Sequence, residues 1–594
     1  MQQIPLEPVS FQHVKITDGF WKSRIDTNRD VTARVCVDQC EQTHRIENFR
    51  VASGRKAGTF GGIYYNDSDV YKVLEGIAYM LMDHGDPALE KTADDIIDDI
   101  CAAQQEDGYL YTYFTLNTPE NRWTDLSFHE AYCLGHMVEG AVAYHRATGK
   151  DKWLKAAIRA VRQMMSVIGP GKKHWVTGHE ELELALVTLY RHTGDESFLD
   201  YAQWLVDERG HGHLSTPMYA NKDFFKPEYC QDDVPARELS RVTGHAVRAM
   251  YYYSALADIA SLKGDKALEA ALLRLWNNVV PANYYITGGI GQSAHNEGFT
   301  RDWSLPNLTA YCETCAAVGM ALWNHRMNLL TGEAKYADIV ETEMYNGILS
   351  GVSLSGDRFF YVNPLSSVGA HHRQRWYGTS CCPTNIVRFL PSVGGYAYAT
   401  DDGGVYVNQY LPGRAELTTK AGEVELCVNT NYPWDGQISI SVIKAPDGAR
   451  LSLRIPGWCK SWSITQNGAS VAPICEKGYA ALSVRADNRV ELTLDMPVRL
   501  ERADPRVVED AGRVAVARGP IVYCAEEVDN PGIVSEYFPA EKSISVSAQA
   551  QLASADGLPD GTVALSMDGV TLIPYCLWDN RAAGAMAVWL KERP

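Results

Sequence analysis

The chain of 594 residues is poor in basic side chains, with 55 Lys and Arg against 73 Asp and Glu, and its formal net charge is −18. Contacts to nucleic-acid phosphates need a basic surface, so this deficit argues against a nucleic-acid partner. A neutral ligand such as a sugar is compatible with an acidic protein. The composition, 46% apolar and 22% charged, is that of an ordinary globular protein.

Long apolar segments are also missing. No run of about 18 apolar residues occurs, which is the length that a membrane-spanning helix requires, so we expect no membrane partner. The stretch from Met1 to Pro8 carries neither the basic nor the apolar region of a secretory leader, and we therefore expect a cytoplasmic protein. The 14 cysteines are scattered through the chain, which in that compartment predicts free thiols.

Two common functional motifs are absent. His129 and His136 are seven residues apart, so they lack the four-residue spacing of a helical zinc-protease pair. The glycine-rich run at residues 287–298 does not sit between a strand and a helix, as a dinucleotide-binding loop would. These absences argue against a metalloprotease and against a dinucleotide-binding enzyme.

The first two thirds of the sequence predicts pairs of helices. A glycine stop followed by an acidic restart recurs at Gly85, Gly149, Gly194, Gly264 and Gly332. Glycine accepts the left-handed conformation just beyond a helix end, and an acidic residue suits the start of the next helix. Five stops over about 250 residues suggest a closed repeat of helix pairs. We predict an (α/α)6 barrel, with an open superhelical solenoid as the alternative.

From about residue 400 the pattern changes to short runs that alternate apolar and polar residues, which is typical of antiparallel β-sandwiches. Residues 405–410, 437–442 and 450–455 are examples, and residues 513–523 predict a strand pair that opens a second β unit. We therefore predict a multidomain α+β protein. Its expected parts are an N-terminal strand at 1–14 packed on a β domain, the helical barrel at 15–398, and β-sandwich domains at 399–505 and 506–594.

Two cysteine groups are candidates for a metal site. Glu313 and Cys315 lie in one group, and Cys381 and Cys382 are adjacent in the other. Zinc binds thiolate, imidazole and carboxylate in tetrahedral sets, so these four side chains would suffice. Buried free cysteines that act as small hydrophobes explain the same spacing equally well.

Glu297 ends the glycine-rich run, whose glycines permit a tight backbone that could present the carboxylate toward a cavity. Taken alone, the residue is better interpreted as a solvated loop glutamate. The 14 Trp and 32 Tyr residues favour carbohydrate binding mildly, since most aromatic side chains serve the core.

Together these residues resemble glycoside hydrolase family 127, the β-L-arabinofuranosidases, over nearly the whole chain. The combination of Glu313-Thr314-Cys315 with Ser380-Cys381-Cys382-Pro383 is the specific part of this resemblance. Supporting segments are Asp67-Ser68-Asp69-Val70, Gln105-Glu106-Asp107-Gly108-Tyr109-Leu110, Gly244-His245-Ala246-Val247-Arg248, Phe360-Tyr361-Val362-Asn363-Pro364-Leu365 and Asn431-Tyr432-Pro433-Trp434-Asp435-Gly436.

The resemblance implies an α/α barrel with β-sandwich domains and a Zn²⁺ ion held by Glu313, Cys315, Cys381 and Cys382. It also implies that Cys381 is the nucleophile and Glu297 the acid/base. Five further residues would contact the sugar, namely His129, His179, His245, Glu341 and Tyr361.

We therefore expect a retaining exo-glycosidase that releases a terminal furanose, most simply β-L-arabinofuranose, from a small oligosaccharide or glycoside. Retention needs a nucleophile and an acid/base on either side of the scissile bond, and zinc would hold the cysteine as thiolate. The alternatives are another furanoside as substrate, a barrel epimerase or lyase, and a non-catalytic sugar-binding protein with a structural zinc. A homodimer is compatible with the sequence.

Overall fold

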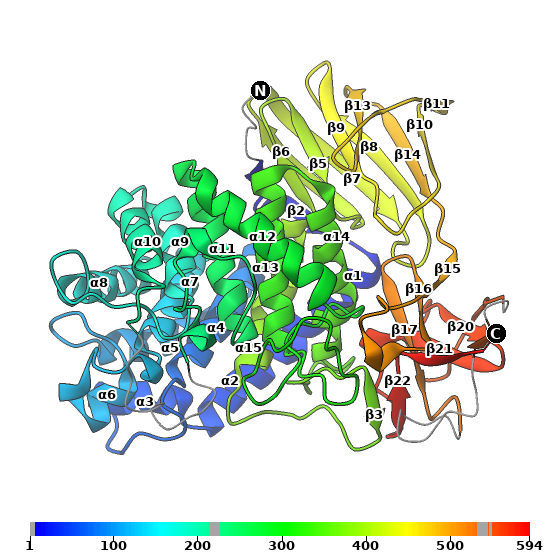
Figure 1. Ribbon diagram of the computed structural model, residues 1–594. Coiled ribbons are helices and arrows are strands. Elements are labelled where there is room, and N and C mark those ends of the chain that lie inside the picture. The colour runs from blue at the N-terminus through cyan, green and yellow to red at the C-terminus, as the bar shows by residue number, and fades with distance from the viewer. Residues whose placement is uncertain (1–5, 214–225, 532–543, 546–548, 594) are drawn as a thin grey trace.

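The computed structural model describes residues 6–213, 226–531, 544–545 and 549–593. The helices gather on one side of the molecule and the strands on the other, in chain order (Figure 1). A helical domain is thus followed by sheet-rich domains, as the sequence predicts. Among the residues that the structure describes, no helix combines the length and the apolar character needed to cross a membrane.

Six helices pack against one another in a closed ring, in which the last of them contacts the first. They are α4 (Asp67–Asp83), α7 (Glu130–Thr148), α9 (Leu182–Thr193), α11 (Ala246–Lys263), α13 (Thr314–Thr331) and α15 (Cys381–Phe389). In α11 every residue from Ala246 to Ala260 is buried, as expected for a helix surrounded by protein. The contact between α15 and α4 closes the ring, which an open solenoid would not do. The arrangement as six complete helix pairs stays a prediction.

The remaining helices lie outside this ring, and several of them are amphipathic. In α8, Trp153, Ala157 and Val161 face the interior at helical spacing, while charged residues between them face solvent. The outer helices are α1 (Gly19–Thr27), α2 (Ala33–Gln42), α3 (Arg45–Ala52), α5 (Pro87–Ala103), α6 (Thr112–Asn117), α8 (Lys152–Val167), α10 (Glu196–Glu208), α12 (Lys266–Ala282) and α14 (Ala334–Thr342).

Four of the five predicted glycine stops take the left-handed conformation. Gly149, Gly194, Gly264 and Gly332 cap α7, α9, α11 and α13 with φ values of 73°, 73°, 67° and 67°. Gly85 differs, because α4 already ends at Asp83 and the extended residue His84 is its cap. The restart after Gly85 is as predicted: Asp86 accepts hydrogen bonds from the first turn of α5.

Two sheets follow the helical domain. One has the order β1-β4-β5-β9-β13-β12 and the other β11-β10-β14-β8-β7-β6-β2. Most neighbours are antiparallel, but β5 pairs with β9 in parallel, which the prediction of a purely antiparallel sandwich did not anticipate. The strands are β1 (Glu7–Pro8), β2 (Val14–Ile16), β4 (Tyr398–Thr400), β5 (Gly404–Val407), β6 (Gly413–Thr419), β7 (Gly422–Thr430), β8 (Gln437–Lys444), β9 (Ala449–Arg454), β10 (Trp462–Gln466), β11 (Ala469–Ser470), β12 (Ile474–Glu476), β13 (Tyr479–Val484) and β14 (Arg489–Leu494).

A third sheet is built mainly from the end of the chain, with the order β18-β23-β16-β17-β21-β20-β19. The predicted strand pair is present as β16 and β17, which run antiparallel. A strand of the helical domain, β3, joins this sheet through β22. The strands are β3 (Ser366–Val368), β15 (Val498–Glu501), β16 (Arg513–Arg518), β17 (Ile521–Glu526), β18 (Ile544–Ser545), β19 (Gln551–Ala553), β20 (Ala564–Met567), β21 (Val570–Pro574), β22 (Ala585–Ala587) and β23 (Leu590–Arg593).

The N-terminal strands add to the two sheets of the middle region: β1 pairs with β4 and β2 pairs with β6. Strand β15 pairs with β16 of the third sheet. Residues 1–5 of the predicted N-terminal segment lie outside the described residues. The domain boundaries that we predict from the sequence stay predictions.

Candidate active site

The four predicted metal ligands meet at the beginnings of two ring helices. Glu313 is the N-terminal cap of α13 and Cys315 lies in its first turn, while Cys381 and Cys382 are the first two residues of α15. Their ligand atoms all lie within 4.8 Å of one another. The N-terminal end of a helix favours negative charge, so two such ends facing one cluster suit thiolates and a carboxylate.

The individual contacts within this cluster are short. Cys315 Sγ lies 3.4 Å from Cys382 Sγ, and Cys381 Sγ lies 3.3 Å from Glu313 Oε1. Cys382 and Glu313 are almost completely buried, whereas Cys381 is partly exposed. Cys381 is therefore the most accessible member of the cluster.

The cluster carries little negative charge without a cation. Burial disfavours a thiolate, yet hydrogen bonds from Cys381 and Cys382 lower the pKa of Cys315 to about 6. The hydrogen bond with Cys315 raises the pKa of Cys381, while burial and the neighbouring Cys381 raise that of Glu313. Negative charges on four ligand atoms this close together would repel one another. A divalent cation would offset that repulsion and let all four groups ionise. Three sulfurs and one oxygen are a donor set that zinc prefers.

A buried ion pair holds the loop that leads into Cys381. Arg45 Nε donates to Asp69 Oδ2 at 2.8 Å, and both side chains are buried. The same guanidinium donates to the Gly378 carbonyl at 2.7 Å and lies 3.3 Å from Ser380 Oγ. The position of Cys381 thus depends on residues that are more than 300 positions away in the chain.

A pocket of about 110 Å³ opens beside Cys381. It lies where the six ring helices begin, because most of its residues come from the first turn of a ring helix or from the loop just before it, while Tyr229, Glu297 and Tyr361 come from further upstream in the connecting segments. It is lined by Tyr64, Tyr65, Ser68, Asp69, His129, Tyr132, His179, Tyr229, His245, Val247, Arg248, Glu297, Glu313, Cys315, Tyr361, Thr379 and Cys381. The closed ring therefore brings helix starts that are far apart in sequence to one place.

The three predicted histidines form a row along the wall of this pocket. The ring of His179 lies 5.6 Å from that of His129 and 5.6 Å from that of His245. Burial lowers the pKa of all three, that of His129 to about 3, so they are neutral at neutral pH. Nδ1 of His129 lies 2.6 Å from the Ser127 carbonyl and must donate to it. We therefore assign Nε2 of His129 as an acceptor, which suits a sugar hydroxyl.

Glu297 faces the same pocket from the glycine-rich run. Its backbone is left-handed, with φ of 50°, and its carbonyl accepts from Ala246 N at the start of α11. The next residue must be glycine, because a Cβ at Gly298 would collide with the Gly244 carbonyl. This close approach fixes the run against α11 and turns Glu297 inward.

Three groups act on the carboxylate of Glu297. His245 Nε2 lies 3.0 Å from Oε2, and Tyr311 Oη donates to Oε1 at 3.1 Å. Burial opposes ionisation, but these hydrogen bonds and the charge of Arg248 lower the pKa of Glu297 to about 2. The carboxylate is thus ionised in the free protein and bonded to a neutral histidine.

Tyr361 lies in the pocket as predicted, with its Oη 3.4 Å from Cys381 Sγ. Glu341 does not line it. The carboxylate of Glu341 instead accepts hydrogen bonds from Tyr432 and Arg454 and, at 3.1 Å, from Trp458 Nε1, all of which belong to the middle region. Because Glu341 is buried and bonded in this way, the structure gives no support to its predicted contact with the sugar.

Sequence reasoning missed several pocket residues. Tyr311 bonds to Glu297 and contacts the ring of Tyr361 at 6.1 Å, and Tyr229 Oη lies 3.5 Å from Glu297 Oε2. Arg248 influences the pKa of both Glu297 and the histidines. Tyr311 and Arg248 share one signal, a position at or just before the first turn of a ring helix, whereas Tyr229 lies in a separate turn, Pro227–Cys230, and carries no such signal.

A larger cavity, of about 400 Å³, lies between α12, α14 and the third sheet. Trp458, Arg499 and Trp589 line it, but none of the four predicted metal ligands does. We assign the active site to the smaller pocket, because there a partly exposed thiol faces a carboxylate and a row of neutral histidines.

The fold and this pocket define a multidomain enzyme whose site pairs a cysteine thiol with a carboxyl group beside polar and aromatic side chains. Comparison with known proteins identifies it further. The sequence matches the profiles of the GH127 catalytic domain of beta-L-arabinofuranosidase at residues 13–395, the middle domain at 404–498 and the C-terminal domain of glycoside hydrolase family 127 at 498–591. The chain belongs to glycoside hydrolase family 127, and it is a glycoside hydrolase.

Its relatives are similar over their whole length. A non-reducing end beta-L-arabinofuranosidase of Bifidobacterium longum subsp. longum is 36% identical, over 98% of this chain and 100% of the relative. The structure of a GH127 beta-L-arabinofuranosidase from Geobacillus stearothermophilus T6 has a TM-score of 0.92 at 37% identity, covering 98% of this chain and 100% of that one. A GH127 beta-arabinofuranosidase has a TM-score of 0.92 at 38% identity, covering 99% and 98%.

Proposed function

We propose that this glycoside hydrolase releases terminal β-L-arabinofuranose from a small oligosaccharide or glycoside, with Cys381 as nucleophile and Glu297 as acid/base. The observation that carries the proposal is that both residues line one pocket, where a partly exposed thiol faces a carboxyl group. The names of the relatives support the choice of sugar. We further propose that His129, His179, His245 and Tyr361 contact the sugar.

The size of the pocket supports a single terminal sugar as the group it binds. A volume of about 110 Å³ has room for roughly ten water-sized groups, since each needs about 10–15 Å³. That is the size of one pentose ring. A longer glycan would extend outward from this pocket, which favours removal of the terminal sugar over cleavage within a chain.

We also propose that the metal is zinc, held by Glu313, Cys315, Cys381 and Cys382. When bound, it would remove the thiol proton and supply Cys381 as thiolate at neutral pH. Cys315, Cys382 and Glu313 would hold the ion, since all three are buried. Of the four ligands, Cys381 is the one that is partly exposed.

The proposed reaction has two steps with a common acid/base. Cys381 Sγ attacks the anomeric carbon, the bond to the leaving oxygen breaks, and the proton held by the His245–Glu297 pair passes through Glu297 to that oxygen. In the second step Glu297 takes a proton from water, whose oxygen attacks the same carbon. The carbon–sulfur bond breaks, Cys381 returns to thiolate, and the sugar leaves with retained configuration.

A panel of aryl furanosides tests this proposal, with hydrolysis of each measured before and after treatment with a zinc chelator. We expect the β-L-arabinofuranoside to be hydrolysed fastest, activity to fall on chelation, and zinc to restore it. Preference for another furanoside would overturn the sugar assignment. An unsaturated, ultraviolet-absorbing product would indicate a lyase. Absence of turnover with zinc bound would indicate a sugar-binding protein. The homodimer stays a prediction. Analytical ultracentrifugation of the purified protein measures its oligomeric state.

A further inference from the structure

The metal-ligand turn, residues 312–315, rests on a neighbouring extended segment, residues 360–365. Glu313 pairs with Val362 as an isolated antiparallel bridge. Thr314 N donates to the Tyr361 carbonyl at 3.0 Å, and its Oγ1 donates to the Phe360 carbonyl at 2.8 Å. Because this segment also carries Tyr361, it fixes both the position of the metal-ligand turn and the position of a pocket residue.

The third sheet and its loops cover the other side of this segment. The ring of Phe360 stacks on that of Trp578, with centroids 4.8 Å apart. Tyr575 Oη donates to the Pro364 carbonyl at 3.0 Å, and Val588 N donates to the Leu365 carbonyl at 2.9 Å. The segment thus lies between the metal-ligand turn and the C-terminal domain.

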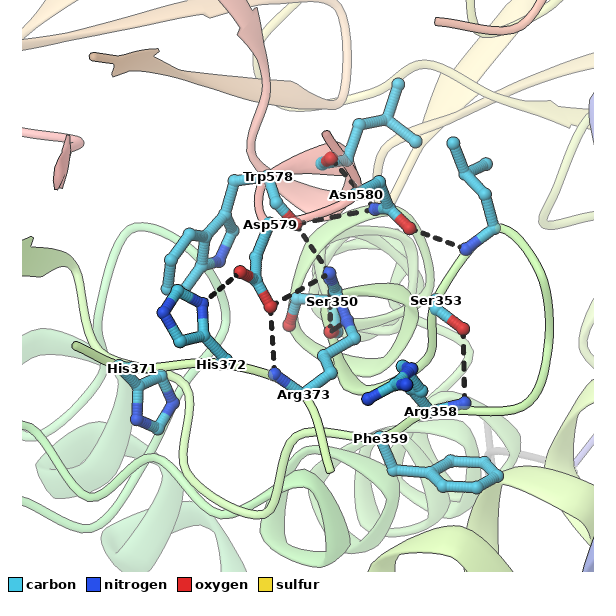
Figure 2. A network of polar contacts seen from close by, with 12 residues as sticks. Ser350, Ser353, Arg358, Phe359, His371, His372, Arg373, Trp578, Asp579 and Asn580 are labelled. Carbon is cyan, nitrogen blue, oxygen red and sulfur yellow. Dashed lines mark hydrogen bonds and ion pairs between the residues drawn. The ribbon is translucent and has the colours of Figure 1, made fainter. Parts of the chain in front are cut away.

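Arg373 connects the two domains at this place. Its Nη1 donates to the Trp578 carbonyl at 2.5 Å, while Nε and Nη2 donate to the Ser350 carbonyl at 3.1 and 2.8 Å. Its backbone N donates to Asp579 Oδ2 at 2.8 Å, and His372 binds the other oxygen of that carboxylate. Figure 2 shows Asp579 facing both residues, with the Arg373 side chain reaching Ser350. Arg373 is only 3% exposed.

From Ser350 the contacts continue to the metal-ligand turn. Ser350 Oγ donates to Asn363 Oδ1 at 2.8 Å, which leaves the amide nitrogen of Asn363 facing the turn. That nitrogen donates to the Cys312 carbonyl and to Thr314 Oγ1, both at 2.9 Å. Cys312 has a left-handed φ of 41°, a conformation that surrounding contacts must hold.

We propose that Arg373 is a positioning residue for the metal-ligand turn, through which the C-terminal domain holds Glu313 and Cys315 in place for metal binding. The inference rests on the proposed zinc site. Its physical basis is that the hydrogen-bond partners of metal ligands fix the ligands' orientation, and their loss typically weakens metal binding roughly 10–100-fold. Arg373 acts further back, through Ser350 and Asn363. A residue that merely joined two domains would change stability and leave the metal affinity as it was.

The test compares Arg373→Met with Arg518→Met. Arg518 also links two domains, since its guanidinium donates to the Trp434 carbonyl at 2.7 Å, but among the described residues it makes no hydrogen bond to residues 312–315 or 360–365. Zinc affinity of each folded full-length protein is measured by competition with a chromophoric chelator, and the unfolding midpoint of the metal-free proteins is measured beside it. We expect Arg373→Met to weaken zinc binding roughly 10–100-fold and Arg518→Met to leave it within about twofold.

A smaller substitution keeps the test decisive if Arg373→Met does not fold. Ser350→Ala removes only the hydroxyl that orients Asn363, and we expect it to weaken zinc binding in the same direction. Arg373→Lys keeps the charge and one donor, and it should recover part of the affinity. If wild type binds zinc tightly while both Arg373→Met and Ser350→Ala bind it equally well, the inference is overturned. If wild type itself binds no zinc, the proposed metal site fails first.

Discussion

His245 Nε2 lies 3.0 Å from Glu297 Oε2, and this contact joins the cap of α11 to the carboxylate of the glycine-rich run. The histidine receives a hydrogen bond at Nδ1 from Arg248 N, so its Nε2 carries the proton that points at Glu297. Burial lowers the pKa of His245, while His245 and Tyr311 lower that of Glu297. The two residues thus titrate as a pair, which has consequences for the pH profile.

The pair predicts an acidic optimum for kcat/KM. Acid catalysis needs one proton on the pair, and that proton is lost as the pH rises through the lowered pKa of His245, below its usual 6.5. A second proton binds only near the pKa of Glu297, about 2. We therefore expect kcat/KM to fall as the pH rises toward 7. A pH–rate profile that is flat from acidic to neutral pH would contradict this.

Replacing Glu297 separates its role as acid in the first step from its role as base in the second. Glu297→Gln should lower kcat/KM by about 10²–10⁴-fold for substrates with poor leaving groups, because these need a proton. Aryl furanosides whose leaving groups need no proton should lose much less in the first step. The measurement is a plot of kcat/KM against leaving-group pKa for wild type and variant. Equal losses across the series would exclude Glu297 as the acid.

The two adjacent cysteines should respond differently to the same change. Cys381→Ser should lose about 10⁴-fold or more in kcat, since a hydroxyl is a far weaker nucleophile than a thiolate, while much of the bound zinc remains on the other three ligands. Cys382→Ser, the matched neighbour, should instead lower the zinc content. Metal analysis beside kinetics distinguishes the two. Near-full activity of zinc-bound Cys381→Ser would refute the nucleophile assignment.

Glu341 should prove structural. It is buried against Arg454, whose guanidinium also binds Asp338, so Glu341→Gln breaks a buried charge network and should lower the free energy of unfolding by about 3 kcal/mol. KM of the folded enzyme should not change. Glu333→Gln is the control at the start of the same helix, because its ion pair with Lys335 is exposed and contributes at most about 1 kcal/mol. A raised KM without destabilisation would restore Glu341 to the sugar site.

Much of the fold follows from local patterns. Apolar residues at helical spacing and glycines such as Gly149 and Gly264 identified helices and their ends, because both effects act within a few residues. Alternation identified β8 and β9 in the same way. The parallel pairing of β5 with β9 was not predictable, since nothing within either strand selects its partner or direction.

The sequence by itself determined which residue types were available and, through resemblance to a known family, that Glu313, Cys315, Cys381 and Cys382 form one set. Only the tertiary structure decided which of the predicted residues meet. Cys381 and Glu313 are 68 positions apart in the chain, yet Cys381 Sγ lies 3.3 Å from Glu313 Oε1, because the ring of helices brings the starts of α13 and α15 together. The same packing turned Glu341 toward the middle region and placed Arg373 behind the ligand turn. Such neighbours are set by contacts across the whole fold, which local propensity and spacing do not encode.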